Sequence, residues 1–106
     1  MQTIIVKLDL RKLANVDLGI SDSIVDRAAK ASGGAIADGN YGYFSPDGSA
    51  AVWLSAENAV EGAKLLVKLF QSEKFCENDL TVAAEIYISK EEHALLFDCT
   101  RVYPAE

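Results

Sequence analysis

The side chains best suited to nucleophilic chemistry in this sequence are Cys99 and His93, with Asp98 next to the cysteine. A thiol nucleophile normally needs a general base within hydrogen-bonding reach and a third group that orients the base. His93 is the only histidine and falls in a predicted turn. A strand predicted over residues 94–102 would place Asp98 and Cys99 on opposite faces. We therefore predict no catalytic residue, and we interpret Cys99 as a structural thiol and His93 as a solvated turn residue.

Metal and cofactor motifs are missing from the sequence. There is no C-x-x-C or H-x-x-x-H pair for zinc. Residues 38–42 (DGNYG) have the character of a calcium loop start, but the third oxygen ligand and the closing glutamate are lacking. Gly33 and Gly34 follow a predicted helix, so they end that helix and do not open a phosphate-binding loop. We predict no metal site, no cofactor and no cofactor-binding residue.

Aromatic and acidic residues gather around a predicted hairpin and form the main candidate for binding. Tyr and Trp are favoured at the centres of protein interfaces, and acidic side chains at the rim attract a basic partner. The alternative is that Trp53 and one tyrosine only pack against the sheet or under a helix. The partner-binding candidates are Asp38, Tyr41, Tyr43, Asp47, Trp53, Glu57 and Glu61.

Acidic residues on and after the second predicted helix form another candidate surface. Its alternative interpretation is an ordinary solvated helix face. The members of this set are Glu57, Glu61, Glu73, Glu77 and Asp79.

The overall charge indicates the class of partner. Sixteen Asp and Glu against ten Lys and Arg give a net charge of −6 and a pI near 4.7. Such a chain repels phosphate backbones and anionic lipid and attracts basic proteins. We therefore predict a basic protein partner, no nucleic acid and no membrane, although the same charge also serves solubility.

Length and composition predict one globular domain over residues 1–106, because half of the residues are hydrophobic and a quarter are charged. The first residues show no signal peptide, and no apolar stretch is long enough to span a membrane. Cys76 and Cys99 are expected to be free thiols. Together these features predict a cytoplasmic protein.

The first half of the chain reads as a strand, a helix and a hairpin. Apolar residues alternate over 3–10, which is typical of a half-buried strand. Ser23 is the predicted start of a helix that ends at Gly33. Residues 35–55 form a predicted hairpin with its turn at 45–48 and a second turn or bulge at 38–40. Ser55 is the predicted cap of a second helix that runs to Ser72.

The second half adds two strands, over 80–89 and 94–102, joined by a turn at 90–93. The order β-α-β-β-α-β-β predicts an α+β fold. We expect a ferredoxin-like two-layer sandwich, with both helices on one face of the sheet and one added edge strand.

Residues 4–15 and 38–54 resemble those of small bacterial immunity proteins, which are encoded beside polymorphic or contact-delivered toxins. This resemblance implies an intracellular protein that binds a cognate toxin domain and blocks its active site. It carries over no individual functional residue. The leading interpretation is therefore a non-enzymatic immunity protein that inhibits a basic toxin domain.

Two alternatives belong to other functional classes. One is a small-ligand-binding or regulatory domain that forms a homodimer through its sheet. It would bury Ile5, Ala51, Trp53 and Ala83 between subunits. The other, which the sequence favours least, is an enzyme with a divergent site near Cys99 and His93.

Overall fold

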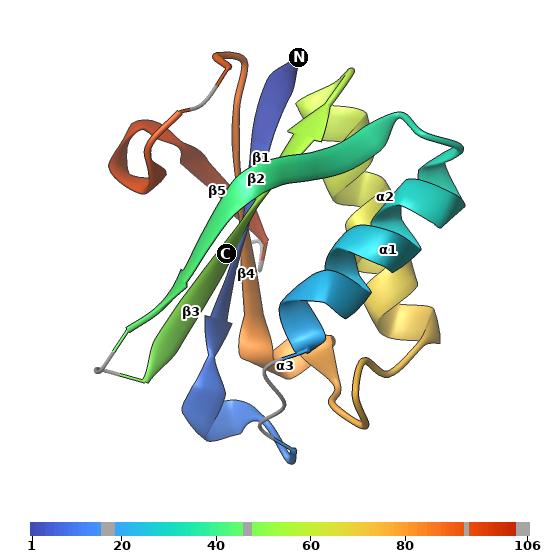
Figure 1. Ribbon diagram of the computed structural model, residues 1–106, viewed down its shortest axis with the longest axis vertical. Helices are drawn as coiled ribbons and strands as arrows, with labels where there is room; N and C mark the ends of the chain where they lie inside the picture. The colour runs from blue at the N-terminus through green and yellow to red at the C-terminus, as the bar shows by residue number, and fades with distance from the viewer. Residues whose placement is uncertain (16–18, 46–47, 93, 104–106) are drawn as a thin grey trace.

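The computed structural model describes residues 1–15, 19–45, 48–92 and 94–103, which fold into an antiparallel sheet and helices (Figure 1). The elements in chain order are β1 (Gln2–Asp9), the 3-10 helix η1 (Leu10–Lys12), α1 (Ile20–Ser32), β2 (Ile36–Phe44), β3 (Ser49–Ala56), α2 (Ala59–Ser72), α3 (Leu80–Ala83), β4 (Ala84–Ser89), the 3-10 helix η2 (Leu96–Asp98) and β5 (Thr100–Tyr103). No helix among the described residues is long and apolar enough to cross a membrane.

The sheet of the described residues has five strands in the order β2-β3-β1-β4-β5, and every neighbouring pair is antiparallel. Helices α1 and α2 lie side by side on one face (Figure 1). The predicted α+β class is confirmed. The first strand of the chain is the central one, so both of its edges are paired.

The main core lies between the sheet and the two long helices. Ile4, Val6 and Leu8 of β1 point into it and are fully buried with Ile24 of α1 and Leu66 of α2. The opposite face of β1 is buried as well, because Ile5 is 0% exposed. The prediction of a half-buried first strand is therefore wrong.

A second, smaller core covers the outer face of the sheet. Ile5, Ala51 and Trp53 form it, with Leu96 and Cys99 packed against them. The segment between β4 and β5 lies on the side of the sheet away from the helices (Figure 1). This segment shields the outer face from water.

The covering segment replaces most of the strand predicted over 94–102. Only Thr100–Tyr103 pairs with β4, while Leu96–Asp98 is a turn of 3-10 helix. Asp98 and Cys99 therefore do not lie in a strand, and the prediction that a strand places them on opposite faces does not apply. The physical reason is that apolar side chains on the outer face need cover, which an extended edge strand would not supply.

Both long helices begin at residues other than the predicted ones. Helix α1 starts at Ile20 after Gly19, since the buried Ile20 joins Ile24 and Ala28 on one face, so Ser23 lies inside the helix. Helix α2 is capped by the side chain of Asn58 and not by Ser55, which belongs to β3. The predicted ends of the helices are confirmed, at the left-handed Gly33 and at Ser72.

The strand predicted from Leu80 begins four residues later. Residues Leu80–Ala83 form a helical turn, and the side chain of Asp79 caps it by accepting from the Thr81 amide. Val82 is 61% exposed, so the apolar alternation does not reach it. A local cap thus overrides the period-two pattern.

The predicted hairpin and its bulge are confirmed. The Gly48 amide donates to the Ser45 carbonyl at 3.2 Å, which closes the turn between β2 and β3. The register shifts between Asp38 and Tyr41. At Gly39 a Cβ atom would lie 2.6 Å from the Trp53 carbonyl oxygen, so the bulge needs a glycine there.

Candidate functional site

The predicted partner-binding residues do not form one surface. Tyr41 and Tyr43 lie on the outer face of the sheet opposite Trp53 and Ala51 of β3. Asp38 lies across the bulge and lines a groove on the helix side. The glutamates of the set, Glu57 and Glu61, lie just before and inside the first turn of α2. Asp47 falls outside the described residues.

Trp53 is a packing residue. It is 8% exposed, and its ring makes an edge contact with Tyr41 at 4.8 Å between centroids and a tilted contact with Tyr43 at 6.0 Å. Its indole nitrogen donates to the Ala94 carbonyl. Trp53 therefore supports the outer face from within and presents little of its own surface to a partner.

The homodimer alternative loses its predicted contact surface. Ile5, Ala51 and Trp53 are already buried within the chain, and Ala83 lies in the main core at α3. A second copy of the chain would have to displace residues 94–99 to reach Ile5, Ala51 and Trp53.

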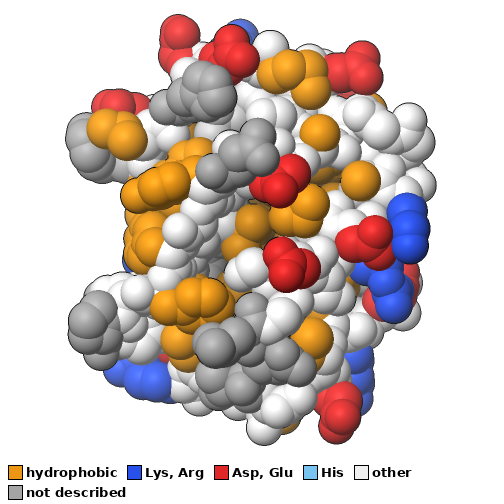
Figure 2. Space-filling model, viewed as in Figure 1, with side chains coloured by type: hydrophobic (Ala, Val, Ile, Leu, Met, Phe, Trp, Pro, Cys, Tyr) orange, Lys and Arg blue, Asp and Glu red, His pale blue; other side chains and the backbone are white. Residues whose placement is uncertain are grey.

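An acidic and aromatic groove lies between α1 and the edge strand β2. Ser21, Asp22 and Val25 form one wall, while the other wall comes mainly from β2, and the cavity measures about 390 Å³. On the β2 side Tyr41 is 61% exposed and Phe44 is 43% exposed, which is unusual for large hydrophobic residues. Figure 2 shows this side of the molecule, where hydrophobic side chains flank a hollow and acidic side chains lie beside them.

The second acidic set is largely engaged in local contacts. Glu61 pairs with Lys64 at 3.8 Å, Glu73 pairs with Arg27 of α1, and Asp79 caps α3. These contacts offset part of the charge that the sequence suggested for this surface. The groove beside β2 is therefore the better candidate for a basic partner.

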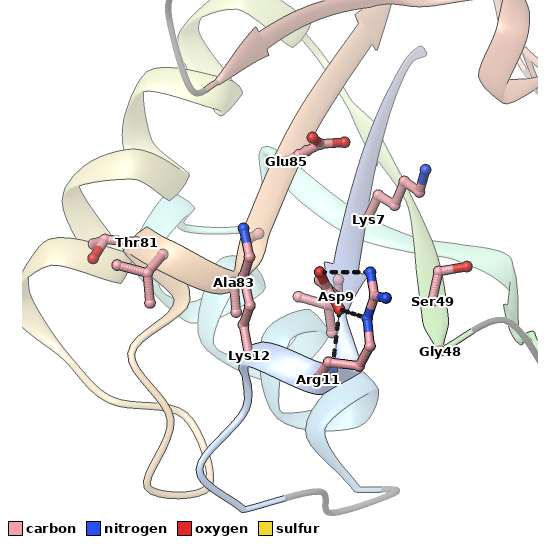
Figure 3. A pocket seen from close by; sticks show the side chains of 12 residues that line it. Lys7, Asp9, Arg11, Lys12, Gly48, Ser49, Thr81, Ala83 and Glu85 are labelled. Atoms are coloured by element: carbon pink, nitrogen blue, oxygen red, sulfur yellow. Dashed lines mark hydrogen bonds and ion pairs between the residues drawn. The ribbon is translucent and has the colours of Figure 1, made fainter.

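A separate polar cavity of about 250 Å³ lies where β1 ends, beside the start of β4 and the turn of the hairpin (Figure 3). Its walls carry three bases, Lys7, Arg11 and Lys12, and two acids, Asp9 and Glu85. Arg11 bonds Asp9 at 3.1 and 3.3 Å. These bonds, with one from the Arg11 amide, hold the pKa of the Asp9 carboxyl below its usual value.

The sequence interpretation missed this cavity. Its signal was the run of charged side chains over residues 7–12, which alternate with leucines at the end of the first strand. The strand predicted over residues 3–10 includes Lys7 and Asp9 but not Arg11 and Lys12. The position of the charged run next to the residues at 81–85 depends on the pairing of β1 with β4, which a single sequence does not show.

Nucleophilic and metal-binding side chains stay apart in the described part of the chain. Within it no group of three or more His, Cys, Asp or Glu side chains is placed to hold a metal ion. Both cysteines are free. Burial and then the Asp98 charge raise the pKa of the Cys99 thiol, which reduces its nucleophilic thiolate form. His93 lies outside the described residues.

Comparison with known proteins assigns this chain to no group. No family model, no curated protein and no solved structure matches it.

Proposed function

We propose that this chain is a non-enzymatic binding protein that receives a basic protein partner in the groove between α1 and β2. The observation that carries the proposal is the exposed Phe44 in a groove that also contains Asp22 and Asp38. The exposed Tyr41 of the same edge strand lines this groove, although its ring packs against Trp53 on the outer face of the sheet. Exposed aromatic rings beside carboxylates are the composition of a protein interface with a basic counterpart.

The net charge and the edge of the sheet also support a basic protein partner. The net charge of −6 attracts a basic protein over a distance and speeds its association. Strand β2 pairs only with β3 among the described strands, so its outer edge has backbone groups to offer a partner. The immunity-type interpretation adds that this partner is a toxin domain whose active site becomes blocked.

We also propose that the fold is a ferredoxin-like sandwich and that the protein is cytoplasmic. A ferredoxin-like sandwich is supported by the strand order β2-β3-β1-β4, with α1 following β1 and α2 following β3. Strand β5 is then the added edge strand. A cytoplasmic location is supported by the two free cysteines, Cys76 and Cys99.

Charge reversal in the groove tests the function. The double variant Asp22→Lys, Asp38→Lys is compared with Asp26→Lys, which changes an exposed residue of α1 paired with Lys30 and absent from the groove lining. Each protein is used to capture partners from a lysate of the source organism. We expect one basic protein that binds the wild type and Asp26→Lys but is lost from the double variant.

Two results would contradict the proposal. Equal capture by all three proteins would mean that the groove does not bind the partner. A captured enzyme whose activity is unchanged by saturating amounts of this protein would rule out inhibition. The homodimer alternative is tested separately by light scattering, in which a monomer at every concentration contradicts it.

A further inference from the structure

The polar cavity at the end of β1 lies apart from the α1/β2 groove and shares none of its lining residues. Lys7 comes from β1, Lys12 from η1, Ser49 from the start of β3, and Thr81 and Glu85 from α3 and β4. Residues distant in the sequence therefore line one cavity (Figure 3).

The acids of the cavity have partners. Asp9 is held by Arg11, which bonds both of its carboxylate oxygens. Glu85 accepts from the Tyr87 hydroxyl at 2.8 Å and pairs with Arg101 at 3.8 Å. The charges of these two carboxylates are thus offset locally.

Two bases of the cavity have no such partner. Within the described residues, the ammonium groups of Lys7 and Lys12 make no ion pair and no hydrogen bond. The lining has three bases and two acids, a net charge of +1, and Arg101, which pairs with Glu85 from outside the lining, brings the local sum to +2. In a protein of net charge −6, this is a local reversal of sign.

We propose that this cavity binds a phosphate group, either as a free phosphate ion or as part of a small phosphorylated molecule. A phosphomonoester carries between one and a half and two negative charges near neutral pH, roughly the charge that Lys7 and Lys12 leave uncompensated. Lysine binds phosphate as a point charge, and Ser49 adds a hydroxyl group to the lining. The cavity, at about 250 Å³, has room for more than the phosphate group alone.

Inorganic phosphate is the probe for the test. Backbone amide resonances of the labelled full chain are followed during titration with phosphate, with chloride at the same ionic strength as the reference. We expect saturable shifts at residues 7–12, 48–49 and 81–85. Lys7→Gln and Lys12→Gln should each weaken binding about tenfold, since each removes a charge-assisted contact.

Two further variants make the test specific. Lys90→Gln removes an equal charge from an exposed residue outside the cavity lining, so it should leave the affinity unchanged. Asp9→Asn removes a negative charge from the lining, so it should strengthen binding. Absence of saturable shifts in the wild type, or equal weakening by Lys90→Gln and Lys12→Gln, would overturn the proposal.

Titration with a sugar phosphate separates the two sources of the group. Tighter binding than that of inorganic phosphate, with further shifts around the cavity, supports a phosphorylated molecule. Equal or weaker binding supports the free ion.

Discussion

The indole nitrogen of Trp53 donates a hydrogen bond of 2.8 Å to the carbonyl oxygen of Ala94. This bond fastens the middle of β3 to the segment that follows β4. The Thr3 hydroxyl adds a second attachment, because it donates to the Glu91 carbonyl at 2.7 Å and accepts from the Ala94 amide at 3.2 Å. The cover on the outer face of the sheet is therefore held by polar contacts as well as by apolar packing.

Truncating Trp53 should destabilise the fold strongly. Trp53→Ala removes a large buried ring, and we expect it to lower the free energy of unfolding by about 3–5 kcal/mol. Trp53→Phe keeps most of the packing but leaves the Ala94 carbonyl unpaired, at a cost of about 1–3 kcal/mol. Urea unfolding measures both. The control Tyr41→Ala removes an exposed ring and should lower the free energy of unfolding by only about 1 kcal/mol. An equal loss in Tyr41→Ala and Trp53→Ala would contradict the assignment of Trp53 as a packing residue.

Asn78 is expected to be the most costly polar residue to replace. It is fully buried, and its side chain accepts from the Asn15 amide at 2.7 Å and donates to the carbonyls of Asn15 and Cys76. Asn78→Ala removes these bonds from the amide and the carbonyl of Asn15, so we expect a loss of about 2–4 kcal/mol in urea unfolding. Asn15→Ala, which removes an exposed amide, is the control and should cost much less.

Replacing Glu77 with glycine should stabilise the fold. Cys76 and Glu77 have φ angles of 50° and 69°, which close the tight turn between Phe75 and Asn78. This left-handed region favours glycine, so Glu77→Gly should raise the stability by about 0.5–1 kcal/mol. Glu77→Val, with a branched side chain, should lower it. Thermal unfolding of both variants checks the sign, and a loss of stability in Glu77→Gly would show that the turn is not strained.

Two aspartates should contribute to stability only above strongly acid pH. The pKa of Asp9 is lowered by bonds from the Arg11 side chain and amide, and the pKa of Asp79 by bonds from the Thr81 hydroxyl and amide. Because each folded pKa lies below the unfolded value near 3.8, the contribution is complete above that pH. It is lost as the pH falls through the folded pKa.

The test is thermal unfolding of Asp9→Asn and Asp79→Asn as the pH is lowered. Both variants should unfold at lower temperature than the wild type near neutral pH, and the difference should shrink below pH 3.8. The exposed Asp26→Asn serves as the control for a general loss of charge. A difference that stays constant with pH would contradict the role of these carboxylates.

Local signals predicted much of the fold. The alternation in β1, the Pro-Asp-Gly turn of the hairpin and the glycine after α1 depend on neighbouring residues, which a sequence displays directly. The start of α1 was missed because its anchor is Ile20, a core contact rather than a cap. The covering segment was missed because only the three-dimensional sheet shows that Ile5 and Trp53 share a face that needs cover.

The candidate sites were predictable only in part. Tyr41 and Asp38 do line a groove, but the groove also needs Asp22 and Val25 from α1, whose packing beside β2 is a tertiary contact. Trp53 was assigned to the candidate surface by residue type, but it packs with its cross-strand neighbour Ile5 in the second core. The Lys7 and Lys12 cavity depends on the pairing of β1 with β4 and was not predicted.

The central position of β1 has a consequence for synthesis on the ribosome. β1 is translated before every other strand of the sheet, yet its partners are β3 and β4, and residues around position 94 complete its outer face. Its apolar side chains are fully buried only after almost the whole domain has emerged, since contacts between distant residues form late. The nascent chain therefore carries an unpaired apolar strand for most of its elongation, and chaperones that shield such segments are expected to act on it.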